Sequence, residues 1–327
     1  MEQAINVLEQ YELEVKGVRK GRGNWIVSSK EGEFVLKEYN GNEERAILQK
    51  LITDRIMQKT GVLVQEIVPN KEGKLCTGEC DAKKFTLQTY MEGRECDLKD
   101  QKDCIRTVTA MAQMHKGMYF SNEESMSGIC AYSLKNEFRK RNNELRRVRR
   151  YLKEKKQKNE FERFIYKHFE RFFETALEVE ESWEQYEPYV LSQADSLFFC
   201  HGDFQHHNVW MNHREMMILQ FEKFVPDLPC RDLYLFMRKL SEKNNWDCTI
   251  GKEILKTYEK ERELSIIERI SMVYRFAYPE KFWKIVNYYF NSKKSFMPEK
   301  NMEKFVKVLE QEEYKEHFIN ETLRKLM

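Results

Sequence analysis

Hydrophobic and polar positions follow two different rhythms along this chain. Residues 11–92 carry short β-branched or aromatic runs that glycine-containing turns separate, a pattern typical of strands. The predicted strands are 13–15, 25–27, 34–37, 62–68 and 85–91. Hairpin turns are expected at 21–24 and 30–33, where glycine permits the required backbone. Residues 43–59 have apolar positions at helical spacing, which predicts a helix between the third and fourth strands.

Beyond residue 93 the apolar spacing becomes helical almost throughout. The predicted helical stretches are a segment ending near His115, the span 134–183 and the span 231–327. Ser265 and Glu268 have the spacing of a capping box, and Pro279 suits the first turn of a further helix. Short strands and loops are expected at 195–225. The pattern therefore predicts an α+β chain with a small sheet-rich part and a large helical part.

Composition narrows the class of protein. The 327 residues are 41% hydrophobic, which is enough to bury a core, and 56 Lys and Arg nearly balance 54 Asp and Glu. This charge balance gives no indication of a nucleic-acid or membrane partner. No stretch approaches 18 uncharged apolar residues, and the N-terminus lacks a basic start with an apolar run. We expect neither a membrane span nor an export signal.

The cysteines indicate a reducing compartment. The eight are scattered at positions 76, 80, 96, 104, 130, 200, 230 and 248. They form no Cys-x-x-Cys pair, and none has the zinc-finger spacing to histidine. We interpret them as reduced, buried thiols of a cytosolic protein. The use of some of them in an oxidised, cross-linked shell stays open.

Candidate chemistry is concentrated at residues 201–208, with the sequence HGDFQHHN. Phosphoryl transfer needs a carboxylate that orients the acceptor hydroxyl, which fits Asp203, and oxygen ligands for magnesium, which fits the amide of Asn208. His201 is expected to hold the loop backbone. The alternative is a polar loop that contains three histidines by chance.

Lys37 ends the predicted strand 34–37, seven residues before Glu44 near the start of a helix. An ion pair between them would aim the ammonium group at nucleotide phosphates. The alternative is a surface lysine at a strand end.

These segments together resemble a known superfamily. The matching pieces are VLK at 35–37, LQTYMEGR at 87–94, MAQMH at 111–115, CHGDFQHHN at 200–208, DL at 232–233 and PEKFWK at 279–284. They are similar to the aminoglycoside phosphotransferase and choline kinase-like group, which shares the protein-kinase fold. The segments 87–94 and 279–284 resemble the spore coat protein S family of endospore-forming bacteria.

The resemblance implies a bilobal protein-kinase-like fold, with a small antiparallel-sheet lobe at 1–92 and a mainly helical lobe at 93–327. It implies ATP and magnesium as cofactors. Lys37 and Glu44 would be the phosphate-orienting ion pair. Asp203 would be the catalytic carboxylate.

Five further positions take roles from the same resemblance. The segment Tyr90, Met91 and Glu92 would be the hinge that meets adenine through backbone hydrogen bonds. Asn208 would be a metal ligand. Asp232 would accept backbone hydrogen bonds that brace the catalytic loop.

The sequence departs from the family at the second metal ligand, where Gln220 replaces an aspartate. Magnesium favours carboxylate oxygen, and glutamine offers only a neutral carbonyl. A unit charge about 4 Å away contributes about 4 kcal/mol at an effective dielectric of about 20. An uncompensated loss would slow catalysis roughly a thousandfold. Glu222 would point to the same side about 6.6 Å away if this segment were a strand, and is either a substitute ligand or an ordinary polar residue.

Three other segments have two interpretations each. Residues 17–23 hold three basic residues in an irregular glycine-containing turn, which either attracts an anion or does not. Residues 135–158 hold twelve Lys or Arg against three Glu, and form either a solvated basic face or a docking surface for an acidic partner. The aromatic residues of 276–290 form either a helix core or a sugar-stacking platform.

Two main functions follow as hypotheses, beside a third in which the chain is a basic scaffold for an acidic protein. The first is a degenerate kinase-fold protein that serves as a structural or binding component of the spore coat, beside other coat proteins. It would be made in the mother-cell cytoplasm and deposited on the forespore, and its cleft would hold a nucleotide, another anion or nothing. The second is an active ATP-dependent phosphotransferase for a small hydroxylated or amino compound.

Overall fold

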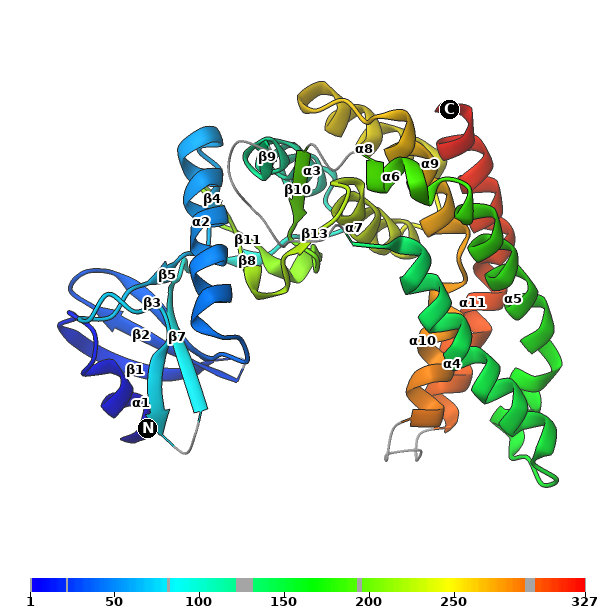
Figure 1. The fold of residues 1–327 in the computed structure, drawn as a ribbon, viewed down its shortest axis with the longest axis horizontal. Helices are drawn as coiled ribbons and strands as arrows, with labels where there is room; N and C mark the ends of the chain where they lie inside the picture. The colour runs from blue at the N-terminus through cyan, green and yellow to red at the C-terminus, as the bar shows by residue number, and fades with distance from the viewer. Residues whose placement is uncertain are drawn as a thin grey trace. The chain divides into compact units, whose positions relative to one another are not determined.

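The structure is a computed structural model that describes residues 2–21, 23–80, 83–121, 132–192, 196–291 and 298–326 (Figure 1). Its contacts divide the chain into two compact units. The first comprises residues 1–119, 198–225 and 260–262. The second comprises residues 120–197, 226–259 and 263–327. The segment that carries the HGDFQHHN sequence thus belongs to the same unit as the N-terminal sheet, whereas the predicted lobe boundary would separate them.

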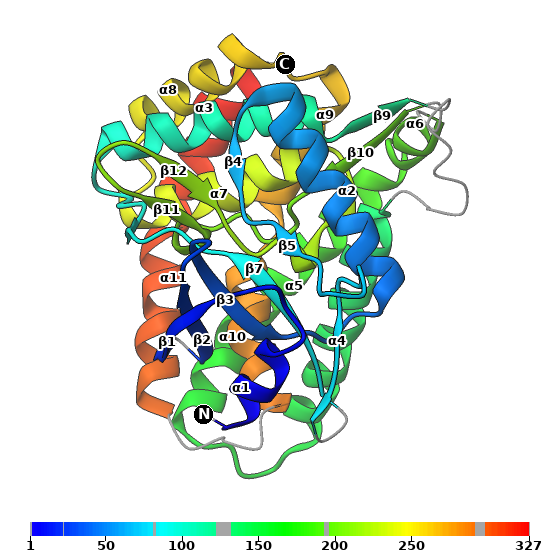
Figure 2. The ribbon, with the colours of Figure 1, turned by 90° about the vertical axis from the view of Figure 1, so that its left-hand side faces the viewer.

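An antiparallel sheet forms the N-terminal part of the first unit. Its main strands are β1 (Val15–Gly21), β2 (Asn24–Ser29), β3 (Glu33–Glu38), β7 (Lys83–Thr89) and β5 (Ile67–Val68), in the order β1-β2-β3-β7-β5. The short β6 (Thr77–Cys80) pairs with β7. Figure 2 shows these strands side by side. The predicted antiparallel sheet is therefore confirmed.

Hairpin chemistry sets the register of the first strands. Gly21 pairs with Asn24, and Gly23, which lies between them in the chain, has a φ of 82°. Such a left-handed backbone costs glycine little. The hairpin turn predicted at 21–24 is thus confirmed. The first strand runs from Val15 to Gly21, so the expected strand 13–15 is wrong, and residues 17–21 form a strand and not an irregular turn. Most residues of β1 are exposed, so the strand lacks the alternation of hydrophobic and polar residues by which a strand is predicted.

One helix face and one sheet face build the core of this region. Helix α1 (Glu2–Leu8), which the apolar pattern did not predict, places Val7 and Leu8 against the buried strand residues Val27, Leu36 and Leu87. Helix α2 (Glu43–Thr60) begins at the N-cap Asn42 and ends at Gly61 in the left-handed conformation. The predicted helix 43–59 is thus confirmed.

A second, smaller sheet of the first unit contains β11 (Val209–Met211), the strand that directly follows the loop 201–208. Its order is β4 (Leu63–Val64), β12 (Met216–Ile218), β11 and β8 (Arg94–Glu95). The expected single strand at 62–68 is split between the two sheets, as β4 and β5. Helix α3 (Gln101–Gly117) packs against α2, and Gly117 lies so close that an added Cβ would be 2.8 Å from the Cα of Ile56. The elements β9 (Tyr119–Ser121), β10 (Ser196–Cys200) and β13 (Val225–Pro226) are short strands with residues in both units.

The second unit is helical. It contains α4 (Leu134–Glu154), α5 (Glu160–Glu184), α6 (Glu187–Ser192), α7 (Cys230–Lys243), α8 (Cys248–Glu261, whose last two residues belong to the first unit), α9 (Ile266–Ala277), α10 (Glu280–Asn291) and α11 (Pro298–Phe318). The π-helical turn η4 (Ile319–Leu323) and the 3₁₀ turn η5 (Arg324–Leu326) follow. Figures 1 and 2 show α4, α5, α10 and α11 side by side. The capping box of Ser265 and Glu268 is confirmed at α9.

Aromatic side chains fill this helical unit. Phe172 stacks on Phe282 with ring centroids 4.6 Å apart, and Phe138 stacks on Tyr278 at 4.8 Å. The aromatic residues of 276–290 thus contribute to the helix core, as one of the two interpretations predicted.

No helix in the described ranges is long and apolar enough to cross a membrane. Cys76, Cys96, Cys104, Cys200, Cys230 and Cys248 form no disulfide bond among the described residues, and the side chains of Cys80 and Cys130 lie outside the described part.

Candidate functional site

A buried histidine holds the loop 201–208 in place. Nε2 of His201 lies 2.6 Å from the carbonyl oxygen of Leu219, and its Nδ1 accepts a hydrogen bond from the backbone N–H of Asp203 at 3.3 Å. These contacts assign the proton to Nε2, which then donates to the carbonyl. The ring also packs edge-on against Phe221 at 4.7 Å. His201 therefore braces two loops and has no free nitrogen for catalysis, as the sequence predicted.

The next residue must be glycine. Gly202 has a φ of 80°, and an added Cβ would lie 2.1 Å from the carbonyl oxygen of Lys223. Both the left-handed backbone and this close approach exclude a side chain. The loop 201–208 is thus pressed directly against the segment 221–223.

Asn208 has the orientation of a ligand-binding amide. Its Nδ2 donates to the backbone oxygen of Asp203 at 2.8 Å, while its Oδ1 is buried and has no hydrogen-bond partner. Buried amide oxygens normally find a donor, so an orphan oxygen marks a place for a cation or a donor group. The structure thus brings Asp203 and Asn208 together as the motif predicts.

The Asp203 carboxylate is engaged. Its Oδ2 accepts from Nζ of Lys223 at 2.8 Å, and its side chain is 27% exposed. Lys223 itself is 70% exposed, so solvent weakens this ion pair and a ligand can displace it. Lys223 was not predicted as a site residue, because nothing in the sequence marks a lysine three residues after Gln220.

Gln220 occupies a strained backbone position beside this loop. Its φ of 64° and ψ of 56° place it in the left-handed region, where asparagine, aspartate and glycine are commoner than glutamine. Its N–H donates to Oε1 of Gln65 at 3.2 Å, and its side chain is exposed. The preceding N–H, of Leu219, donates to the backbone oxygen of Asn208 at 2.8 Å. Strain of this kind recurs at ligand sites, where the surrounding structure enforces it.

Lys37 has a different partner from the predicted one. Its Nζ donates to Oε1 of Gln65 at 2.7 Å and to Oε1 of Glu222 at 3.2 Å. Glu44 is exposed and its Oε2 accepts from the side chain of Asn42, so the expected Lys37–Glu44 ion pair is wrong.

The first turn of α2 explains this exchange. Glu44 lies in the first turn on an exposed helix face, where its negative charge interacts favourably with the helix dipole. It is Arg45 that reaches the loop, with Nη2 donating to the carbonyl oxygens of Glu222 and Phe224 at 2.9 Å each. The helix therefore contributes a cation that fixes the backbone of 222–224, and the carboxylate facing Lys37 comes from that loop.

Glu222 lies on the 3₁₀ turn η3 (Phe221–Lys223), so the strand geometry assumed for it does not apply. Its Oε1 accepts from both Lys37 and Nε2 of Gln88, the latter at 3.0 Å. Burial raises the pKa of this carboxyl, but the Lys37 ammonium and the Gln88 amide outweigh it, and the net pKa is lowered. Glu222 is therefore ionised and serves as the partner of Lys37.

A pocket with a volume of about 370 Å³ lies beside these groups within the first unit. This volume is in the usual range for small-molecule sites. Its lining residues are Arg19, Gly21, Asn24, Ile26, Val35, Lys37, Gln65, Tyr90, Glu95, His207, Trp210, Leu219 and Gln220. Aliphatic side chains from β2 and β3 thus face the same space as Lys37 and Gln220. Such a pocket suits a flat apolar group joined to an anionic one.

The predicted hinge contributes one residue to this lining. Tyr90 lines the pocket, and its ring packs edge-on against Trp210 at 5.6 Å. The N–H of Tyr90 donates to the carbonyl oxygen of Glu33 at 3.0 Å. Met91 is buried and Glu92 is exposed, and neither lines the pocket. Their backbone contact with adenine stays a prediction.

Two glutamines that the motifs did not mark complete the site. Gln65 bridges Lys37 and the backbone of Gln220, and it donates to the carbonyl oxygen of Thr89 at 2.9 Å. Gln88 holds Glu222. Single buried glutamines have no pattern signal in one sequence, so only the tertiary structure identifies them.

The residues fit a nucleotide better than a tightly held divalent cation. Asn208 offers one buried oxygen and Gln220 a neutral amide, while Asp203 and Glu222 are already paired with lysines. Within the described ranges, no group of three or more His, Cys, Asp or Glu side chains is arranged to hold a metal. Magnesium would therefore depend on Asn208 and on a rearranged carboxylate.

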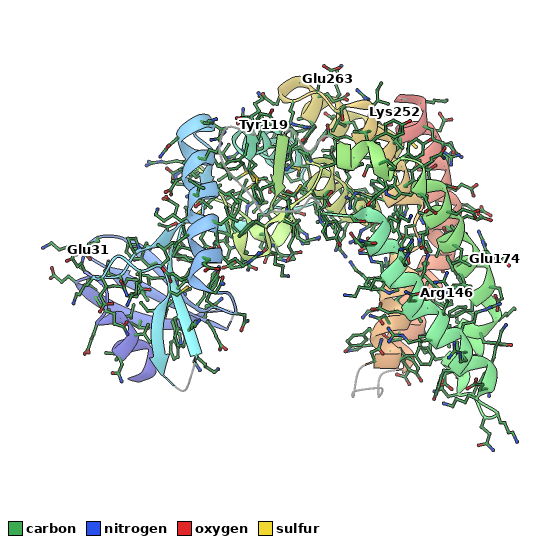
Figure 3. All side chains as sticks on the ribbon, viewed as in Figure 1. Glu31, Tyr119, Arg146, Glu174, Lys252 and Glu263 are labelled. Carbon is green, nitrogen blue, oxygen red and sulfur yellow. The ribbon has the colours of Figure 1, made fainter. Side chains whose placement is uncertain are left out.

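Two predicted features lie in the second unit. Asp232 is buried in the first turn of α7, and its role in bracing the catalytic loop stays a prediction. Several cations of 135–158, on α4 or at its C-cap, are paired with glutamates of α5: Arg139 with Glu180, Arg149 with Glu170, and the C-cap Lys155 with Glu162. Arg146 remains at the surface, hydrogen-bonded to Asn143 (Figure 3). Part of the basic excess is therefore neutralised within the unit.

Sequence comparison identifies the family. Residues 4–322 match the family described as "Spore coat putative kinase YutH". The chain belongs to this family. It is also 22% identical to spore coat protein S of Bacillus subtilis (strain 168) over 320 residues, which are 94% of this chain and 88% of that protein. The predicted family resemblance is thus confirmed.

Structural comparison of this spore coat family member confirms the predicted fold class. An aminoglycoside phosphotransferase from Alicyclobacillus acidocaldarius superposes with a TM-score of 0.83 at 14% identity, covering 98% of this chain and 95% of that one. Amicoumacin kinase, in a complex that includes AMP-PNP and Ca²⁺, gives a TM-score of 0.64 at 13% identity, covering 100% of this chain and 97% of that one. The chain has the kinase-like α+β fold of these phosphotransferases.

Proposed function

We propose that this spore coat family member binds a nucleotide in the pocket beside Lys37 and has lost most of its magnesium-dependent phosphoryl transfer. It would act as a structural or binding component of the coat. The observation that carries the proposal is Gln220: a neutral amide, in a strained left-handed backbone, at the pocket wall next to Asn208. A strained residue is costly to keep, yet here it delivers no charge for a metal.

The pocket supports nucleotide binding independently of the metal. Ile26, Val35 and Leu219 offer an apolar lining for a base, and Lys37 offers a cation for phosphate oxygens. Arg19 adds a second cation at the same pocket. A nucleotide held by two cations needs less help from magnesium than one held by carboxylate-bound metal.

The decisive measurement is the melting temperature with ATP, with and without magnesium, because a ligand of the folded state must stabilise it. We expect ATP alone to stabilise the protein and magnesium to add little. Gln220→Asp should make the stabilisation magnesium-dependent and tighten binding of magnesium–ATP at least tenfold. Gln185→Asp, at an exposed position outside the pocket, is the matched control. Robust native turnover of magnesium–ATP that survives Glu222→Gln would overturn the proposal.

The second candidate is an active phosphotransferase for a small hydroxylated or amino compound. It is favoured by one observation: Asp203 and Asn208 keep the hydrogen-bonded arrangement that leaves an amide oxygen free for a cation. On this proposal Lys223 releases Asp203 when the acceptor binds. Phosphoryl transfer to an amino or hydroxyl acceptor that Asp203→Asn abolishes would establish it.

The cellular role follows from the family. We propose synthesis in the cytoplasm of the sporulating mother cell and deposition on the forespore, with coat proteins as partners. A tagged copy that stays in growing cells and is absent from extracted coat would contradict this role. Coat localisation that persists in an Asp203→Ala, Asn208→Ala double variant would show that placement does not depend on catalysis.

A further inference from the structure

A small cavity of about 40 Å³ lies inside the helical unit, far along the chain from the nucleotide pocket. Helices α5, α7, α9, α10 and α11 supply its walls, together with the loop after α7. Aromatic side chains form much of the lining: Phe172, Tyr234, Trp246, Phe276, Tyr278 and Phe282. A space of this size holds a carboxylate-sized group or one or two waters.

Two buried donors in this cavity have no partner. They are Nε of Arg238 and Nε1 of Trp246, in residues that are 5% and 7% exposed. The other buried polar groups of the lining are used. Tyr234 donates to Glu280, Tyr278 donates to Asn142, and Arg238 donates through Nη1 to Glu242 at 2.9 Å. An unpaired buried donor is costly, so the cavity calls for a molecule that brings acceptors.

The backbone is strained where it delivers one of these donors. Asn245 and Trp246 have φ values of 49° and 59°, both in the left-handed region. This conformation is uncommon and costly for non-glycine residues. The Trp246 ring is then fixed edge-on against Phe318 at 5.6 Å. The chain therefore accepts strain in order to bury an indole whose N–H has no protein partner.

The local charge favours an anion. Glu280 lies within ion-pair distance of Arg141, Arg238 and Lys284, and Glu242 lies near Arg238, Lys239 and Lys281. Arg141 also pairs with Glu137, so five cations face three carboxylates. The lining pair Glu312 and Lys315 adds no net charge. An added carboxylate would offset this excess and accept from both unpaired donors.

A larger pocket adjoins this cavity. It has a volume of about 460 Å³ and shares the lining residues Phe172, Glu312 and Lys315 with the smaller one. Tyr186 and Tyr274, with ring centroids 5.6 Å apart, line it, as do two residues of the π-helical turn η4. Such turns are frequent at functional sites. Its size and its aromatic wall suit the body of a small molecule.

From these observations we propose a second ligand site, in the helical unit, for a small aromatic carboxylic acid. The carboxylate lies in the small cavity, where it accepts hydrogen bonds from Arg238 Nε and Trp246 Nε1, and the aromatic body lies in the larger pocket. The proposal is for binding only, and no reaction is proposed at this site. The site would sense or store a small acid independently of the nucleotide pocket.

The indole ¹⁵N–¹H signals of the five tryptophans test the proposal. The probe is sodium 4-phenylbutyrate, with the neutral 4-phenylbutan-1-ol as the matched compound and acetate as the head group alone. We expect phenylbutyrate to shift the Trp246 signal saturably, and the alcohol and acetate to bind at least tenfold more weakly. The signal of Trp283, whose N–H donates to Glu144 at 2.8 Å, should stay in place as an internal control.

Two variants keep the test decisive. Trp246→Phe retains an aromatic ring without the N–H, and Arg238→Lys retains the charge without Nε. Each should lower the affinity for phenylbutyrate at least tenfold by calorimetry while leaving the affinity for the alcohol unchanged. A Trp246 signal that phenylbutyrate leaves unmoved would mean that the cavity holds water only. Equal affinity for acid and alcohol would likewise overturn the carboxylate assignment.

Discussion

Lys37 and Glu222 are 185 residues apart in the sequence, yet the ammonium of one lies 3.2 Å from a carboxylate oxygen of the other. The Lys37 side chain is 11% exposed and that of Glu222 is 26% exposed, so solvent screens this pair only in part. A lysine beside the pocket is thus held by the loop that follows Gln220. The loop, rather than helix α2, decides where the cation points.

Glu222→Gln should lower the free energy of unfolding by about 1–2 kcal/mol, because it leaves a largely buried cation with a neutral partner. The pKa of Glu222 is lowered in the folded state. Its stabilising contribution is therefore complete above the usual glutamate value of about 4.3 and disappears as the pH falls through the lowered pKa. Denaturant titrations of both proteins between pH 7 and pH 3 should show their difference in free energy of unfolding decrease toward the acid end. Glu44→Gln, on the exposed face of α2, should lose only its helix-dipole contribution of about 0.5 kcal/mol or less, and leave the Lys37 pair intact.

Gly202→Ala should unfold or strongly loosen the loop 201–208, at a cost of at least about 2–3 kcal/mol, because its Cβ would lie 2.1 Å from the Lys223 carbonyl oxygen. The measurement is thermal unfolding with hydrogen exchange of the loop amides. Gly17→Ala is the matched control, since an added Cβ there meets nothing within 4 Å. Equal stability of the two variants would contradict the packing described for Gly202.

Asn208→Asp exchanges an amide donor for a carboxylate that faces the carbonyl oxygen of Asp203. We expect a loss of about 1–3 kcal/mol in the absence of metal, since the 2.8 Å hydrogen bond becomes a repulsive contact. Magnesium should restore part of this loss in stability, because the new carboxylate would replace the unpartnered Oδ1 of Asn208 as a charged ligand for the ion. Asn212→Asp is the control, as Asn212 uses only its Oδ1, which accepts from Arg214 and Glu215. A magnesium-independent loss would exclude a cation from this position.

The cations of residues 135–158 include two sets, one exposed at the surface and one paired with glutamates of α5. Reversal of the surface residues Arg146, Arg147 and Arg150 to Glu should abolish binding to poly-glutamate, a probe for an acidic partner, without changing the melting temperature. In the native protein this binding should weaken steeply with salt, because exposed charges are screened beyond about 10 Å at about 0.1 M.

Reversal of the paired residues Arg139, Arg149 and Lys155 should instead lower the melting temperature by about 2–4 °C, since each then repels its glutamate on α5. Unchanged poly-glutamate binding after reversal of Arg146, Arg147 and Arg150 would leave only the solvated-face interpretation of this helix.

The sequence by itself determined the elements and the chemistry of the loop. Period-two and period-3.6 patterns located β2, β3, β7 and the long helices, because each buries one face. The sequence also predicted that Asp203 and Asn208 lie together. They are five residues apart in one loop, so local geometry brings them into contact independently of the rest of the chain. Strand β1 and helix α1 were misplaced or missed, since an exposed strand and a short terminal helix carry little pattern.

Only the tertiary structure decided which groups surround that loop. The partner of Lys37 was expected on α2 from its nearness in sequence, but the helix phase turns Glu44 to solvent and Arg45 to the loop. Gln65, Gln88 and Lys223 join the site through contacts that span 20 to 155 residues. The unpaired donors of Arg238 and Trp246 are likewise visible only where helices meet. Long-range contacts depend on how whole helices and strands pack together. The hydrophobic pattern of a single sequence indicates which positions are buried, but not which residues they contact.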